Sequence, residues 1–326
     1  MSFKNIIGHE KTINSLQNSI KTNKISHSYL FIGEESIGKK MVATVFAKTL
    51  LCNKNSITPC NDCNSCVKFD TGNHPDFFLL EPEGAHIKKK QIEKVIKNMM
   101  TKPIESEKKI FIIEDSYKMN KTAQNSFLKT LEEPPEFVNF ILISTRSTNL
   151  LPTIVSRCEI IKFFPTQKEK IIELLTNRYN KDLEDGEFIS SFSRGRVGKA
   201  IELAKSEDFF QKRDEIIEIV DKVVKGDKLK IFYSQDFFNN NKDNINELLD
   251  IILYWFRDLL IYKELGDCGL IINKDKIGLL STETFLSKEK ISDIMDSVQL
   301  TKNNIKYNVN YQLALEVMFL KMQEVY

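Results

Sequence analysis

Five short, largely apolar runs restrict the fold of this chain most strongly. Each run holds four to six residues, and stretches of helical character separate them. The runs are Tyr29–Ile32, Phe77–Leu80, Ile110–Ile113, Phe140–Ile143 and Glu159–Phe164. Strands that are apolar on both faces and alternate with helices are typical of a parallel sheet covered by helices on both sides. The first half of the chain is therefore predicted to form an α/β core.

The strand pattern ends at Pro165, and the remainder of the chain has helical character. Short helices are predicted over Gln167–Asn180, Glu187–Phe192 and Lys199–Lys205. The stretch Leu248–Tyr262 is apolar on most faces, which indicates a helix buried on several sides. A chain of 326 residues exceeds one ordinary core, so several domains are expected. The predicted boundaries are residues 1–165 for the core, 166–206 for a helical lid and 207–326 for a helical C-terminal domain.

Charge and hydropathy disfavour several classes of protein. No segment approaches the roughly 18 uninterrupted apolar residues that a membrane helix needs, and the first residues lack the apolar run of a signal peptide. The formal net charge is only +2, which disfavours a stand-alone DNA-binding protein, because such proteins cluster many cations against phosphates. A cytoplasmic protein without a membrane partner is expected. Salt-dependent DNA binding by the isolated chain would instead favour a stand-alone DNA-binding protein.

Gly33, Gly38 and Lys39 fit the phosphate-loop pattern G-x-x-x-x-G-K between a predicted strand and a predicted helix. Glycines allow backbone N–H groups to curl around a phosphate at a helix N-terminus, and the lysine adds a point charge. An ordinary strand-to-helix turn is the alternative. The next residue, Lys40, replaces the hydroxyl that normally binds magnesium, and Glu34 and Glu35 place negative charge inside the loop. ATP and magnesium are therefore expected to bind weakly or not at all.

Two adjacent carboxylates, Glu114 and Asp115, follow the apolar run Ile110–Ile113. In nucleotide hydrolases the first residue of such a pair, an aspartate, holds magnesium and the second, a glutamate, activates water. The order is reversed here, so Asp115 is one methylene shorter than the usual base. An acidic strand end that faces solvent is the alternative. Together with Lys40, the reversal predicts a nucleotide site that has lost hydrolysis.

Four cysteines lie close together in the sequence, at Cys52, Cys60, Cys63 and Cys66. Two-residue gaps allow neighbouring thiolates to bind one ion at roughly 2.3 Å, and four thiolates close a tetrahedral structural zinc site. A disulfide pair and an iron–sulfur cluster are the alternatives. Because four sulfurs leave no open position for water, the predicted zinc module at residues 52–66 has a structural role.

Several further stretches resemble the AAA+ clamp-loader family of bacterial DNA polymerase III. They are Ile7–Glu10, Ser26–Phe31, the four-cysteine module, His74–Asp76, Glu81–Gly84, Ala123–Pro135, and Asn308–Asn310 with Leu313, Leu315 and Glu316. The resemblance covers nearly the whole chain. The stretches His74–Asp76 and Glu81–Gly84 favour the delta-prime branch, and the chain length also fits it, since the long extensions of tau are missing. The resemblance implies an AAA+ core, a lid, and a collar domain at 207–326 that joins gamma/tau and delta subunits in a hetero-pentameric ring.

The segment Ser156-Arg157-Cys158 resembles the SRC motif of this family. The resemblance implies that Arg157 is an arginine finger, presented across a subunit interface to ATP on the neighbour. In other nucleotide hydrolases such fingers contribute roughly 10³–10⁵ in rate. A surface salt bridge at the end of a strand is the alternative. Ser144 and Thr145 take the place of the family's sensor-1 polar residue, and a core or strand-end hydroxyl is equally expected for both.

Gly198 takes the place of the sensor-2 arginine of the family's active ATPases, although Arg196 or Lys199 could substitute. This departure also disfavours hydrolysis by the chain itself. The resemblance thus implies a non-catalytic subunit that helps load the sliding clamp onto primed DNA during replication. The competing hypothesis is an active AAA+ ATPase of gamma/tau type, with Lys39 on the phosphates, Glu114 on magnesium and Asp115 as base.

Overall fold

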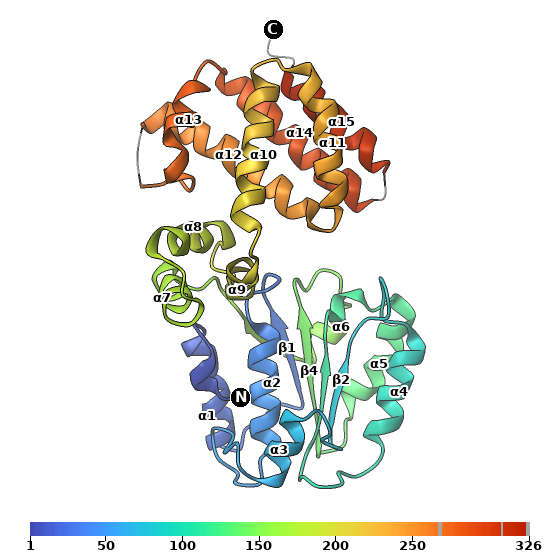
Figure 1. Cartoon of the computed structure of the whole chain (residues 1–326). Coiled ribbons are helices and arrows are strands. Elements are labelled where there is room, and N and C mark those ends of the chain that lie inside the picture. The colour runs from blue at the N-terminus through green and yellow to red at the C-terminus, as the bar shows by residue number, and fades with distance from the viewer. Residues whose placement is uncertain (267–268, 308, 324–326) are drawn as a thin grey trace. The chain divides into compact units, whose positions relative to one another are not determined.

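The computed structural model describes residues 1–266, 269–307 and 309–323. The chain divides into two compact units, Met1–Glu202 and Leu203–Tyr326, which are described separately below (Figure 1). The division of the first unit into a core and a lid stays a prediction. Asn308, part of one stretch that carries the resemblance, lies outside the described residues. Within the described ranges, no helix combines the length and the apolar character needed to cross a membrane.

A five-stranded parallel sheet forms the centre of the first unit. Its strands are β1 (Ser28–Ile32), β2 (Phe77–Leu80), β3 (Lys109–Ile113), β4 (Val138–Ser144) and β5 (Glu159–Lys162). They lie in the order β2-β3-β4-β1-β5, so the carboxyl ends of β1, β3 and β4 meet at one edge of the sheet. The five predicted strands and their parallel pairing are confirmed, with ends that differ by the one or two residues usual for such boundaries.

Helices cover both faces of this sheet (Figure 1). On one face are α1 (Glu10–Lys21) and α2 (Lys39–Leu51), and on the other α4 (Lys89–Met99), α5 (Lys121–Glu132) and α6 (Pro152–Val155). Successive side chains of a strand point to opposite faces, so Phe31 joins Phe46 in one core and Leu30 joins Phe127 in the other. The sequence did not predict α1, since its polar composition hides the narrow apolar stripe at Ile13 and Leu16.

Four more helices complete the first unit and lead into the second. They are α3 (Asn64–Asp70), α7 (Lys168–Tyr179), α8 (Leu183–Ser193) and α9 (Val197–Lys205). The three helices predicted after Pro165 are confirmed as α7, α8 and α9, each with shifted ends. Helix α3 carries Cys66 and follows the remaining cysteines of the predicted metal module.

The second unit is wholly helical in its described residues. Its helices are α10 (Phe209–Val224), α11 (Lys228–Asn240), α12 (Ile245–Leu265), α13 (Ile277–Thr282), α14 (Lys288–Lys306) and α15 (Tyr311–Gln323). Helix α12 packs against α10, α13 and α14, and Trp255 and Phe256 on it are fully buried. The predicted buried helix is therefore confirmed.

Candidate nucleotide site and metal centre

The phosphate-loop residues connect β1 to the first turn of α2. Gly38 has φ +113°, a conformation that glycine adopts without strain, and it begins the helix. The Lys39 side chain turns back over the loop, where its Nζ donates hydrogen bonds to the carbonyl oxygens of Gly33 at 2.6 Å and Glu34 at 2.5 Å. Burial lowers the pKa of Lys39. Because an ammonium has three N–H donors, one remains that could meet a phosphate.

Lys40 lies next to two carboxylates. Its Nζ is 2.6 Å from Oε2 of Glu114, which follows β3, and 2.7 Å from Oε1 of Glu81, which follows β2. Burial raises the pKa of Glu114 although the ammonium opposes the shift. An ammonium thus occupies the space between the start of α2 and the end of β3. A divalent cation held by Glu114 would compete with this ammonium for the same oxygens.

The Asp115 carboxylate forms an ion pair with a nearby residue of the chain. The backbone of Asp115 has φ +46°, a left-handed conformation unusual for a residue other than glycine. Its Oδ2 lies 2.7 Å from Nζ of Lys118. The hydrogen bond to Asp115 raises the pKa of Lys118. The carboxylate proposed to activate water is therefore engaged by a lysine three residues further along the chain.

The two hydroxyl residues at the end of β4, Ser144 and Thr145, have different surroundings. Ser144 is buried, its Oγ donates to the carbonyl oxygen of Arg146 at 2.6 Å, and the same Oγ accepts from the Arg146 N–H at 3.3 Å. Thr145 is half-buried. The contacts of Ser144 are those of a strand-end turn, so they fit the simpler of its two interpretations.

The first turn of α9 contacts the phosphate loop directly. The Gly198 N–H donates to the carbonyl oxygen of Ser36 at 2.7 Å. A Cβ atom at Gly198 would lie 2.7 Å from that same oxygen, closer than side chains tolerate. The two possible substitutes for a sensor-2 arginine have other partners, since Arg196 Nε donates to the Ser193 carbonyl and Lys199 Nζ lies 3.2 Å from Glu202.

Arg157 lies just after α6 and is half-buried. Its Nη2 is 2.7 Å from Oε1 of Glu132 in the last turn of α5, and its Nη1 donates to the carbonyl oxygen of Thr153 at 2.9 Å. The guanidinium therefore connects the last turn of α5 to α6. The salt bridge that was the alternative interpretation of Arg157 is present, and it leaves three of the five N–H donors for other partners.

The four predicted metal ligands come together in one cluster. The sulfurs of Cys52, Cys60, Cys63 and Cys66 all lie within 4.8 Å of one another. Cys52 Sγ is 4.0 Å from Cys63 Sγ, and Cys60 Sγ is 3.8 Å from Cys66 Sγ. Four sulfurs at about 2.3 Å from one ion would be about 3.8 Å apart, so the cluster fits a single tetrahedral ion. The four thiols are free, which argues against the disulfide alternative.

Buried polar groups anchor this cluster to the core. Lys48 of α2 is buried, and its Nζ donates to Oδ1 of Asn61 at 2.5 Å and to Oδ2 of Asp70 at 2.6 Å. His74 Nε2 lies 2.9 Å from the hydroxyl of Ser65. His74 is therefore a structural contact of Ser65, and the four thiols remain the candidate metal ligands.

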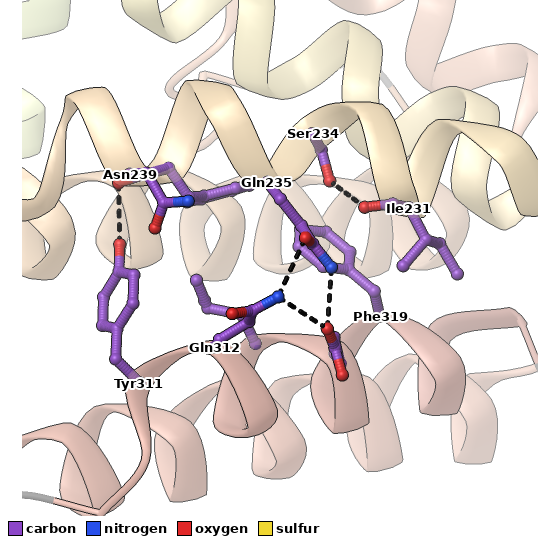
Figure 2. A pocket seen from close by; sticks show the side chains of 10 residues that line it. Ile231, Ser234, Gln235, Asn239, Tyr311, Gln312 and Phe319 are labelled. Atoms are coloured by element: carbon purple, nitrogen blue, oxygen red, sulfur yellow. Dashed lines mark hydrogen bonds between the residues drawn. The ribbon is translucent and has the colours of Figure 1, made fainter.

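A hollow in the second unit lies between α11 and α15 (Figure 2). Its volume of about 10 Å³ holds at most one water molecule. Gln235 Nε2 donates to Oε1 of Glu316 at 2.7 Å, and Gln312 Nε2 donates to Oε1 of Gln235 at 2.9 Å. These bonds join the two helices across the hollow. It therefore belongs to the packing of this unit and offers no ligand pocket.

Sequence reasoning missed three partners of the predicted site residues. Glu81 and Glu132 were noted only within family stretches, and Lys118 was not singled out. All three are charged residues that meet a predicted site residue of opposite charge. Glu81 lies 41 residues from Lys40, and Glu132 lies 25 residues from Arg157. Such long spacings give no periodic signal in the sequence. For Lys118 alone, the three-residue spacing from Asp115 was a usable signal.

Two family profiles match the chain. The profile "DNA polymerase III, delta subunit" matches residues 8–167, and "DNA polymerase III, delta subunit, C terminal" matches residues 207–324. The first covers the phosphate loop, the cysteine cluster and Arg157, and the second covers nearly all of the helical unit.

Individual relatives agree with these profiles. The chain is 30% identical over 313 residues to DNA polymerase III subunit delta-prime of Bacillus subtilis, covering 95% of this chain and 94% of that protein. It is 36% identical over 159 residues to subunit tau/gamma of Haemophilus influenzae, covering 48% of this chain and 23% of that protein. A solved gamma subunit-related protein of Thermotoga maritima superposes with a TM-score of 0.47 and 17% identity, covering 96% of this chain and 99% of that one. The chain therefore belongs to the delta-prime family of DNA polymerase III clamp-loader subunits.

Proposed function

We propose that this subunit has no ATPase activity of its own and instead supplies Arg157 to ATP bound by a gamma/tau-type neighbour. The position of Lys40 is the main support for the absence of ATPase activity. Its ammonium lies 2.6 Å from Glu114 and 2.7 Å from Glu81. Glu114 is the carboxylate that would bind magnesium. A fixed positive charge there competes with the metal, and phosphoryl transfer depends on that metal.

Two further contacts support the loss of hydrolysis. Asp115, the only carboxylate in the place of the water-activating base, is paired with Lys118 at 2.7 Å. The Gly198 N–H is bonded to Ser36 of the phosphate loop, so the lid backbone fills the place from which a sensor-2 side chain would reach a nucleotide. The groups in the places of the magnesium ligand, the water-activating base and the sensor-2 arginine thus all depart from those of an active ATPase.

The arginine finger is proposed for the only SRC motif in the chain. Arg157 is half-buried, and its guanidinium keeps three N–H donors beyond those bound to Glu132 and Thr153.

The helical unit is proposed to serve as the collar. On α15 the side chains of Leu313, Val317 and Leu320 are 54%, 43% and 52% exposed, while Ala314, Leu315, Met318 and Phe319 on the other face are buried. A helix that is apolar all round requires cover on both sides. We assign the outer stripe to a neighbouring collar helix in the proposed hetero-pentamer of delta-prime, gamma/tau and delta subunits.

The cysteine cluster is proposed to bind zinc. Four thiolates at tetrahedral spacing suit zinc, and no ligand position is left for water. Bound there, zinc would hold the cysteine loop and α3 together and would add no chemistry of its own. Through the assembled ring, the subunit would help load the sliding clamp onto primed DNA.

One observation favours the competing function, an active ATPase of gamma/tau type. Lys39 retains one free donor above a loop of the right length, so phosphate binding remains possible. ATP hydrolysis by the purified chain separates the two functions. Our proposal predicts no turnover above background, whereas turnover that Lys39→Ala abolishes would establish the competing function.

A further inference from the structure

The residue that faces Arg157 most closely is Glu132, in the last turn of α5. Its Oε1 lies 2.7 Å from Nη2 of Arg157, although the two residues are 25 positions apart in the sequence. A carboxylate is unfavourable at the carboxyl end of a helix, because the helix dipole is negative there. Glu132 and the next residue, Glu133, place two carboxylates at that end. Helix stability therefore gives no reason for Glu132.

The guanidinium is held from two sides. Glu132 accepts a hydrogen bond from Nη2, and the carbonyl oxygen of Thr153 in α6 accepts one from Nη1 at 2.9 Å. Since the guanidinium is planar and rigid, fixing both terminal nitrogens fixes its orientation. Single exposed ion pairs contribute little to stability, so the energetic gain from this contact is small. Its larger effect is to restrict a flexible side chain to one direction.

We propose that Glu132 is the positioning residue for Arg157: it holds the guanidinium in the direction in which the neighbour's nucleotide is met. This inference depends on the proposed role of Arg157 as a finger. A side chain that is already ordered loses less freedom when it binds the transferring phosphoryl group, and small misplacements of catalytic groups are costly in rate. Glu132 touches no substrate and acts through Arg157.

The test uses the complex reconstituted from this subunit and its gamma/tau-type and delta-type partners. Its ATPase rate would be measured with wild-type subunit, Glu132→Ala, Glu132→Gln and Arg157→Ala, with Glu133→Gln as matched control. Glu133 is the exposed neighbouring glutamate. We expect Glu132→Ala to lower kcat on the order of tenfold without changing KM for ATP. Glu132→Gln keeps an acceptor oxygen and should restore most of the rate, and Glu133→Gln should match wild type.

Structural damage is distinguished by the urea unfolding midpoint and by the yield of assembled complex, both of which should be unchanged in Glu132→Ala. An unchanged or increased kcat in Glu132→Ala would overturn the inference, while a large loss in Arg157→Ala in the same series would leave the proposed function intact. If Arg157→Ala itself had no effect, the proposed function would fail first. A loss of kcat that merely followed a loss of assembly would also overturn the positioning role.

Discussion

The ammonium of Lys40 lies 2.6 Å from the carboxylate of Glu114, the residue predicted from the sequence as the candidate magnesium ligand. One side chain thus provides a positive charge where active relatives of the phosphate-loop type bind a metal. A second carboxylate, that of Glu81, has its Oε1 2.7 Å from the same Lys40 Nζ. The phosphate loop and the carboxyl ends of the strands are retained, and the cation that pairs with Glu114 and Glu81 is the Lys40 ammonium.

Replacing Lys40 by threonine removes this charge and supplies the missing hydroxyl. We expect Lys40→Thr to bind Mn²⁺ in the presence of ATP at least about tenfold more tightly than the wild-type chain, because Glu114 and Glu81 lose their internal counter-ion. Electron paramagnetic resonance of Mn²⁺ measures the difference. Lys94→Thr, at an exposed site on α4, is the control. Equal Mn²⁺ affinity in wild type and Lys40→Thr would contradict the proposed displacement of the metal.

Close packing of the start of α9 against the phosphate loop predicts the effect of a single added methyl group. In Gly198→Ala the new Cβ would lie 2.7 Å from the Ser36 carbonyl oxygen, so the free energy of unfolding should fall by about 1–3 kcal/mol. Gly278, in α13, has open space around it, so Gly278→Ala should leave stability unchanged or raise it by up to about 1 kcal/mol. Urea unfolding of both variants provides the measurement. A Gly198→Ala variant as stable as Gly278→Ala would contradict the close contact between α9 and the phosphate loop.

How far the sequence predicted this arrangement depends on the kind of signal. The strands were predictable because runs such as Ile110–Ile113 are apolar throughout, and the cysteine cluster because its four residues are close in sequence. The pairing of Lys40 with Glu81 was not predictable from the sequence, because a contact between residues on different elements depends on how the strands are ordered in the sheet. The contact of Gly198 with Ser36 was missed for the same reason. The sequence shows that Lys40 stands where a hydroxyl is usual, while only the fold shows that its ammonium lies against Glu114 and Glu81.

The cysteine cluster should bind about one zinc ion per chain. Cys60→Ser removes one ligand, so we expect the zinc content to fall and the thermal unfolding midpoint to decrease. Cys158→Ser is the matched control, because Cys158 lies outside the cluster and is half-buried. Elemental analysis and thermal unfolding measure both effects. A zinc-free wild-type chain purified without chelator, or full zinc in Cys60→Ser, would contradict the assignment.

Glu283 in the second unit predicts a pH dependence of stability. Burial raises the pKa of Glu283 from its ordinary 4.5 to about 8, and its Oε2 accepts a hydrogen bond from Trp255 at 2.9 Å. The folded state therefore binds a proton that the unfolded state releases between these two pH values. Stability should be greatest below the ordinary pKa and should decrease as the pH rises toward about 8.

Glu283→Gln replaces the protonated carboxyl by a neutral group of similar shape. We expect this variant to be more stable than wild type at pH 8 and its stability to vary less between pH 5 and pH 8. Urea unfolding across that range measures the change, with Glu215→Gln at an exposed position of α10 as control. A wild-type chain whose stability rose through this range would contradict the assignment of a protonated Glu283.

The rate of ATP hydrolysis by the reconstituted clamp loader containing Arg157→Ala tests the central claim most directly. If this subunit lacks hydrolysis and serves its neighbour, the chain alone shows no turnover and the complex loses rate on the order of 10³-fold. Complex assembly should be unaffected, because a half-exposed ion pair contributes little to stability. Full ATPase rate in the assembled Arg157→Ala complex would contradict the account.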